Sequence, residues 1–211
     1  MSDRLPHRAS AALAALLLAT LVAGCSSPFS REPLVKQVYL LDPPMPPAVA
    51  KPQPMTARVG LVNVAAPFRG RSFVYREAAL RYETDFYVEF LVAPSSMFTE
   101  QTSRALAAAK VFARVVPPGS GADSDVTLDG FVSTMYADSR DGSPVSADLT
   151  ITYYLTPVAG GATPAWSHEY HKHVELAAHT PAAYAEALNQ EFGEILAELT
   201  RDLAALQIPQ P

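Results

Sequence analysis

The chain has 211 residues, with 16 Lys and Arg against 21 Asp and Glu, which gives a formal net charge of −5. A content of 49% hydrophobic and 18% charged residues is typical of a folded protein and excludes a largely disordered chain. The acidic balance also argues against nucleic-acid binding, because phosphate contacts require clustered Lys and Arg side chains. We therefore expect a protein with a buried core and no nucleic-acid partner.

The first 24 residues have the layout of a secretion signal. Arg4, His7 and Arg8 precede an uncharged run at 9–24 that is rich in Ala, Leu and Val. This run is shorter and richer in alanine than a membrane-spanning helix, which needs ~20 predominantly apolar residues. Removal of the signal, which contains two Arg and one Asp, would leave 187 residues with a formal charge of −6.

Cys25 is the only cysteine of the chain and ends the sequence Val22-Ala-Gly-Cys, which resembles the bacterial lipobox. The resemblance implies cleavage between Gly24 and Cys25, followed by acylation of the thiol and of the new amine with fatty acids such as palmitate. Several acyl chains would hold the protein firmly on a membrane. A single cysteine also excludes an intramolecular disulfide. The alternative is an unmodified thiol within a signal that is cleaved elsewhere.

Ser26 follows the cysteine, where an Asp in this class of lipoprotein would favour retention in the inner membrane. Residues 26–34 then form a tether that reaches at most ~30 Å at ~3.3 Å per residue. The predicted organisation is a signal peptide at 1–24, an acylated tether at 25–34 and a single domain at 35–211. We expect this domain at the periplasmic face of the outer membrane.

The first half of the domain is predicted to be rich in strands. Residues 35–42 favour a first strand, and six prolines at 42–54 exclude a helix or an interior strand in the segment that follows. A stiff connection is favoured there over a polyproline recognition segment. Further strands are predicted at 58–64, 72–77 and 80–92, the last two as a hairpin or bent pair.

A helix is predicted to start at Pro94-Ser95-Ser96 with a hydroxyl cap. The spacing of its apolar and small residues, at steps of three and four, predicts one buried face. This face is formed by Phe98, Thr102, Ala105, Leu106 and Ala109. A strand at 111–116 follows. The clearest hairpin pairs 126–136 with 147–156, since apolar and polar residues alternate through its second strand.

The chain ends with a strand predicted at 166–176 and a long helix that starts at Thr180-Pro181, a cap followed by proline. The helix carries a single apolar stripe from Tyr184 to Leu206. The predicted fold class is α+β: a single domain with a mixed or mostly antiparallel sheet packed by two helices.

Four of the five histidines lie between His168 and His179. Strand alternation would place Glu169, His171, His173 and Glu175 on one face, a residue set that could bind zinc. Neighbours on one strand face are ~6.5 to 7 Å apart, however, and the segment supplies no closing ligand. A solvated polar face is therefore favoured, and no metal site is predicted.

The sequence offers no catalytic constellation. It lacks a phosphate-binding loop, a dinucleotide fingerprint, an HExxH motif and a nucleophile elbow. Asp138, Arg140 and Asp141 are predicted to form a solvated hairpin tip. We expect no enzymatic activity and no cofactor.

Four features in order resemble the ABC-type transport auxiliary lipoproteins, the PqiC-like family associated with MCE proteins. They are the lipobox, Val38-Tyr-Leu-Leu-Asp-Pro43, Phe73-Val-Tyr-Arg76 with Leu80-Arg-Tyr-Glu83, and the segment from Tyr87 to Pro94 before a helix. The resemblance implies a non-enzymatic periplasmic lipoprotein. Such a protein works with an ABC transporter and an MCE-domain protein to move lipids or other hydrophobic molecules between envelope membranes.

Tyr39, Tyr75, Arg76 and Tyr82 match motif positions of this family and are candidate interface residues, with structural roles in strands as the alternative. A lipid-binding carrier that holds its substrate between the sheet and the last helix is the second hypothesis. An envelope hydrolase is the third and has no motif in its favour. Self-association into a homo-oligomer is left open.

Overall fold

The computed structural model describes residues 35–140, 145–159 and 163–207. Residues 36–211 form one compact unit, in which two helices pack on an eight-stranded mixed sheet. The strands are β1 (Gln37–Tyr39), β2 (Gln53–Val64), β3 (Ser72–Arg76), β4 (Tyr82–Phe90), β5 (Phe112–Val116), β6 (Val126–Asp138), β7 (Ser146–Pro157) and β8 (Trp166–Glu175). The helices are α2 (Pro94–Ala109) and α3 (Pro181–Ala205), with a short 3-10 helix, η2 (Ala66–Phe68). The predicted α+β class is confirmed, while Gly24 and Cys25 lie outside the described residues.

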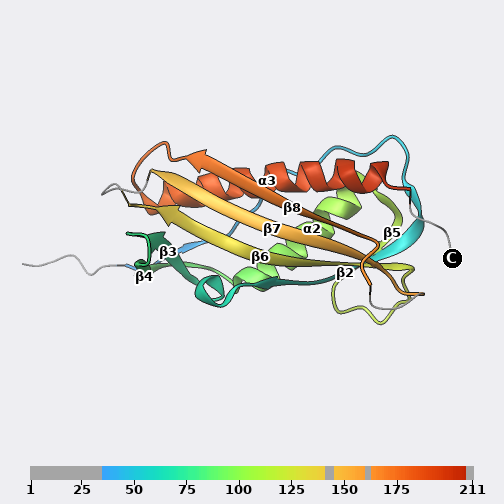
Figure 1. Ribbon diagram of the computed structural model, residues 1–211, viewed down its shortest axis with the longest axis horizontal. Coiled ribbons are helices and arrows are strands. Elements are labelled where there is room, and N and C mark those ends of the chain that lie inside the picture. Colours follow the sequence, from blue (N-terminus) through green and yellow to red (C-terminus); the bar gives the residue numbers. More distant parts are fainter. Residues whose placement is uncertain (1–34, 141–144, 160–162, 208–211) are drawn as a thin grey trace, which may run out of the picture. The chain divides into compact units, whose positions relative to one another are not determined.

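The strand β6 organises the sheet (Figure 1). One of its edges pairs antiparallel with β7, which in turn pairs antiparallel with β8. The other edge pairs in parallel with two strands in succession, β2 along 126–132 and β3 at Ala137 and Asp138. Beyond β2 lies β5, and beyond β3 lie β4 and then β1.

Both helices lie on the same face of the sheet (Figure 1). The rings of Phe98 in α2 and Phe192 in α3 are 4.7 Å apart, and the hydroxyls of Thr102 in α2 and Tyr153 in β7 are 2.8 Å apart. The five residues predicted for the buried face of the first helix are all buried. Neither α2 nor α3 covers the opposite face of the sheet, which we call the open face.

The two helix starts differ from each other. Thr180 caps α3 as predicted, since its hydroxyl accepts a hydrogen bond from the backbone N–H of Ala183 at 3.2 Å. The predicted hydroxyl cap of the first helix is wrong. Pro94 takes the first helical position, so Ala93 is the cap and makes no side-chain bond. The Ser95 hydroxyl instead donates to the carbonyl of Val62 at 2.6 Å and ties the helix to β2.

The proline-rich segment is the connection between β1 and β2 and packs against both helices. The Gln101 side chain in α2 donates to the carbonyl of Leu41 at 3.0 Å, and Pro44 packs so closely on α3 that a Cβ at Gly193 would lie 3.0 Å from it. The next strand begins at Gln53, earlier than predicted. A register shift after Gln53 accommodates the proline at position 54, which the rule against prolines in strands had excluded.

The described residues contain no helix that is long and apolar enough to cross a membrane.

Candidate functional site

A row of polar and aromatic side chains crosses the open face of the sheet. Strand pairing places Arg76 of β3 opposite Tyr82 of β4, Tyr136 of β6 opposite Asp148 of β7, and Asp148 opposite His173 of β8. The sequence neighbours of these residues in β6 and β7 are buried toward the helices, so alternation directs the row to the other side. We call these five residues the open-face row.

Arg76 is held between two tyrosine rings at one end of the row. Its guanidinium carbon is 5.9 Å from the ring centre of Tyr82 and 5.6 Å from that of Tyr136. Its Nη1 donates to the Tyr136 hydroxyl at 3.1 Å. The Phe68 ring packs on both tyrosines, with centroid distances of 6.3 and 6.1 Å. Cation–π contacts of this kind contribute ~0.5 to 1 kcal/mol each at exposed sites and fix the direction of the cation.

Asp148 is the acidic centre of the other end. Its Oδ1 is 3.2 Å from Nδ1 of His173 and 3.6 Å from Nε2 of His171. The residue is only 8% exposed. The two histidines share one face, as predicted, but the carboxylate beside them comes from β7, and sequence reasoning along β8 alone missed it. Among the residues with described positions, no group of three or more His, Cys, Asp or Glu is arranged to hold a metal ion.

The surroundings of Tyr136, in the middle of the row, raise its pKa above the ordinary value of a tyrosine. Burial is the largest cause that raises the pKa of Tyr136, the charge of Asp148 raises it further, and the hydrogen bond from Arg76 acts in the opposite direction. The Tyr136 hydroxyl therefore stays protonated at neutral pH. The row thus presents a cation on aromatic rings at one end and a carboxylate with imidazoles at the other.

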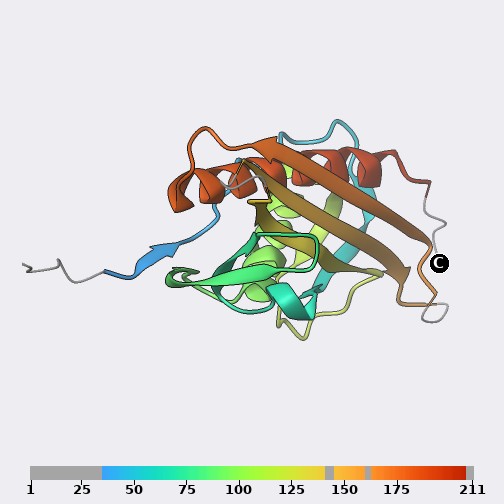
Figure 2. The ribbon, with the colours of Figure 1, turned by 60° about the vertical axis from the view of Figure 1, so that its left-hand side comes forward.

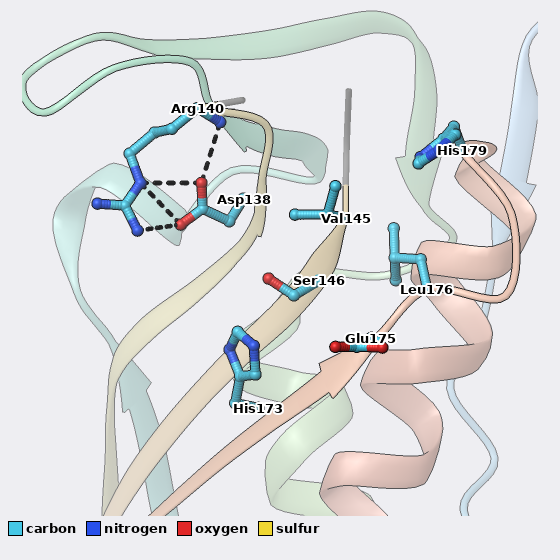
Figure 3. A pocket seen from close by; sticks show the side chains of 8 residues that line it. All are labelled: Asp138, Arg140, Val145, Ser146, His173, Glu175, Leu176 and His179. Atoms are coloured by element: carbon cyan, nitrogen blue, oxygen red, sulfur yellow. Dashed lines mark hydrogen bonds and ion pairs between the residues drawn. The ribbon is translucent and has the colours of Figure 1, made fainter. Parts of the chain in front are cut away.

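A hollow of about 860 Å³ lies at the ends of β6, β7 and β8 (Figure 3). Arg140 donates to both carboxylate oxygens of Asp138, from Nε to Oδ1 at 3.0 Å and from Nη2 to Oδ2 at 2.6 Å. These hydrogen bonds are the main reason that the pKa of Asp138 is lowered. The prediction of a solvated tip is wrong for Asp138, which is buried by this ion pair and by the strand ends, while Asp141 lies outside the described residues. His173 lines the hollow and links it to the row.

The helix α3 carries a buried carboxyl group. Glu191 is inaccessible to solvent, and its carboxyl oxygens make no well-formed hydrogen bond with a described residue; the backbone of Val174 gives only a weak one that partly offsets the effect of burial. Burial, and secondarily the charge of Asp148, raise the pKa of Glu191 to about 9, so it is neutral at pH 7. The sequence carried a signal that we missed: position 191 is three residues after Leu188 and seven after Tyr184, within the apolar stripe.

The four predicted interface residues separate into two pairs. Arg76 and Tyr82 belong to the open-face row. Tyr39 and Tyr75 instead pack on the helix side, where the Tyr39 ring is 5.4 Å from Phe73 and the Tyr75 ring is 6.0 Å from Tyr184. A role in an interface stays a prediction for all four.

Neither a family model nor a curated protein sequence matches this chain. A Xanthomonas campestris protein assigned to the family model DUF330 has a TM-score of 0.67 at 18% identity, over 77% of this chain and 92% of its own. A structure described as an uncharacterized protein has a TM-score of 0.63 at 16% identity, over 80% of this chain and 99% of its own. These two likenesses show a shared fold. PelC from Paraburkholderia phytofirmans, solved as a dodecamer, has a TM-score of 0.41 at 16% identity, over 78% of this chain and 96% of its own.

Proposed function

We propose that this chain is a lipid-anchored periplasmic lipoprotein that serves as an auxiliary component of an ABC/MCE-type system. Such a system moves lipids or other hydrophobic molecules across the envelope. The observation that carries the proposal is the lipobox-like Val22-Ala-Gly-Cys25 directly before a tether and a domain with the family motifs in order. The fold shared with a DUF330 protein supports it. Outer-membrane anchoring follows from Ser26 after the cysteine.

The proposed role is binding rather than catalysis, and the open-face row is the proposed docking surface for the MCE-domain partner. Arg and Tyr side chains dominate the binding energy of many protein interfaces, because they combine large contact areas with directed polar groups. Arg76 and Tyr82 combine these properties on a face that neither α2 nor α3 covers. The aromatic contacts hold the Arg76 side chain before a partner arrives, which lowers the entropy cost of docking.

A lipid-binding carrier is the alternative. The space between the sheet and α3 is occupied by side chains, as the Phe73–Tyr184 ring contact and the Tyr170–Asp202 hydrogen bond show. A shallow groove of about 570 Å³ does lie on the outer side of α3, with Pro44 and Gly193 among its lining residues. Native mass spectrometry that detects co-purified lipid would favour the carrier over the docking protein.

The proposal is tested by affinity capture of the tagged protein from solubilised membranes. We expect recovery of MCE-domain and ABC-transporter components, and a reduced recovery with Arg76→Ala. Arg114→Ala is the matched control, because Arg114 is exposed on β5, away from the row. Cys25→Ser should abolish acylation and membrane association. Wild-type protein that is not acylated, or that recovers no transporter component, would contradict the proposal.

A further inference from the structure

Exposed apolar side chains gather along β1 and β4. Phe86 is 80% exposed and Leu91 is 53% exposed, far more than is usual for such large hydrophobic residues. We define the β1–β4 patch as six exposed apolar or aromatic residues of β1, of the bulged half of β4 and of the segments directly after these strands: Val38, Leu40, Phe86, Tyr87, Leu91 and Val92. A concentration of this kind on a folded domain marks a surface that something covers.

A bulge in β4 holds the aromatic part of the patch. Ser72 of β3 pairs with Glu89 and Val74 pairs with Thr84, so four residues of β4 stand where one residue of β3 does. The Asp85 carboxylate fixes the bulge, since it accepts the backbone N–H groups of Tyr87 at 2.8 Å and Val88 at 3.0 Å. The rings of Phe86 and Tyr87 pack edge to face at 5.1 Å. The aromatic pair is therefore built into the strand and held toward solvent.

The patch lies where the tether enters the domain. β1 pairs in parallel with β4, with Gln37 beside Val88 and Tyr39 beside Phe90. In Figure 2, β1 (blue) lies at the margin of the fold next to the green β3–β4 hairpin. Gln37 is only twelve positions after Cys25, which is at most ~40 Å of extended chain at ~3.3 Å per residue. An anchor at Cys25 thus keeps this margin near the bilayer.

The Glu89 carboxylate at this margin is paired within the protein. The Glu89 carboxylate binds Lys36 at 2.7 Å and Arg71 at 2.5 Å. The hydrogen bond from Lys36 is the main cause that lowers the pKa of Glu89. Pairing reduces the cost of bringing Glu89 toward an apolar medium, while Phe86 and Tyr87 remain exposed beside it. Phe and Tyr are residue types that bind at the interface between lipid headgroups and acyl chains.

We propose that the β1–β4 patch rests on the lipid bilayer, with Phe86 and Tyr87 inserted at the level of the headgroups. This inference depends on the acylation of Cys25 that we proposed above. The acyl chains hold the domain at the membrane, and the patch sets its orientation. The open-face row then has a fixed direction relative to the bilayer, which a docking partner requires.

The test uses acylated full-length protein in phosphatidylcholine vesicles with and without bromine on the acyl chains. Trp166, the single tryptophan, is replaced by Phe, and Phe86→Trp introduces a new reporter. Interfacial side chains lie about 5–10 Å into the headgroup region, so we expect the indole of Phe86→Trp to lose about half of its emission in the brominated vesicles. Phe131→Trp in the same background is the matched control, because Phe131 is exposed on the open face at β6, and it should not be quenched.

The outcomes separate the two proposals. If the wild-type protein carries no acyl group, the proposed lipoprotein function fails. If the protein is acylated and membrane-bound but bromine does not quench the reporter at position 86, the bilayer contact is overturned while the lipoprotein function stands. If Phe86→Asp instead converts a detergent-extracted oligomer into monomers, a second copy of the chain covers the patch, and the bilayer contact is again overturned.

Discussion

Two of the three outer margins of the sheet, the one at β8 and the one formed by β1 and β4, are built in opposite ways. In the part of the fold that is described, β8 pairs with β7 alone and carries charged or imidazole side chains along most of its length. On its helix side, the Tyr170 hydroxyl donates to Asp202 at 2.6 Å and Lys172 donates to Glu198 at 2.7 Å. Charged edge strands of this type resist pairing with other chains.

The β1–β4 margin lacks this protection. β1 has three residues, and β4 exposes Phe86 and Tyr87 on its bulge. Its attachment to the core depends on Phe73, whose ring lies 4.6 Å from Phe90 and 5.1 Å from Tyr184. The comparison teaches that one margin is finished by the protein's own charges, while the other exposes apolar side chains, which the proposed bilayer contact would cover.

Phe73→Ala should produce the largest effect, because it removes the aromatic centre of the β1–β4 margin. Deletion of a fully buried phenylalanine ring lowers the free energy of unfolding by ~3 to 5 kcal/mol. Phe86→Ala is the matched substitution on the same margin. It should change the free energy of unfolding by less than ~0.5 kcal/mol, because the Phe86 ring is exposed. Urea unfolding followed by circular dichroism measures both. A loss of similar size for the two variants would show that Phe86 is packed in the folded protein.

Glu191→Gln should stabilise the protein at neutral pH and make its free energy of unfolding depend less on pH. The pKa of Glu191 is raised from 4.5 to about 9 on folding, so the folded chain binds a proton that the unfolded chain releases between these values. Stability from this group is therefore highest below pH 4.5 and falls as the pH rises toward 9. At 1.36 kcal/mol per pH unit, the penalty at pH 7 is about 3 kcal/mol.

Thermal unfolding at pH 5, 7 and 8.5 tests this expectation. The gain from Glu191→Gln should grow with pH. Glu186→Gln, at an exposed position of the same helix, is the control and should give no such trend. A gain from Glu191→Gln that does not depend on pH would mean that its carboxyl group is ionised in the folded protein.

The elements of this fold were predictable where local chemistry determines them. The cap at Thr180, the apolar stripe of α3 and the alternation in β7 each depend on residues close together in sequence. These signals predicted α3 and the hairpin, and the sheet class followed from the order of the elements.

The candidate site was less predictable, because it depends on strand neighbours that are distant in sequence. Alternation predicts that His171 and His173 share a face, but it does not say that Asp148 of β7 lies beside them. The bulge at Asp85 arises from a register shift between β3 and β4, and no single residue type signals it. The position of Glu191 was readable from its spacing, although its complete burial depends on how α3 packs on the sheet.

Tyr170→Phe should have the smallest effect and tests how the β8 margin is held. Burial raises the pKa of Tyr170, and Asp202 raises it further, so the hydroxyl remains a hydrogen-bond donor to that carboxylate. Loss of a bond to a charged acceptor lowers the free energy of unfolding by about 1.5 kcal/mol. Tyr154→Phe is the control, because the Tyr154 hydroxyl on β7 has no described hydrogen-bond partner and should cost less than ~0.5 kcal/mol. Amide hydrogen exchange should increase in β8 and not in β1 or β4. If exchange instead rises at both margins, they do not open independently, and the contrast between them would be one of surface chemistry alone.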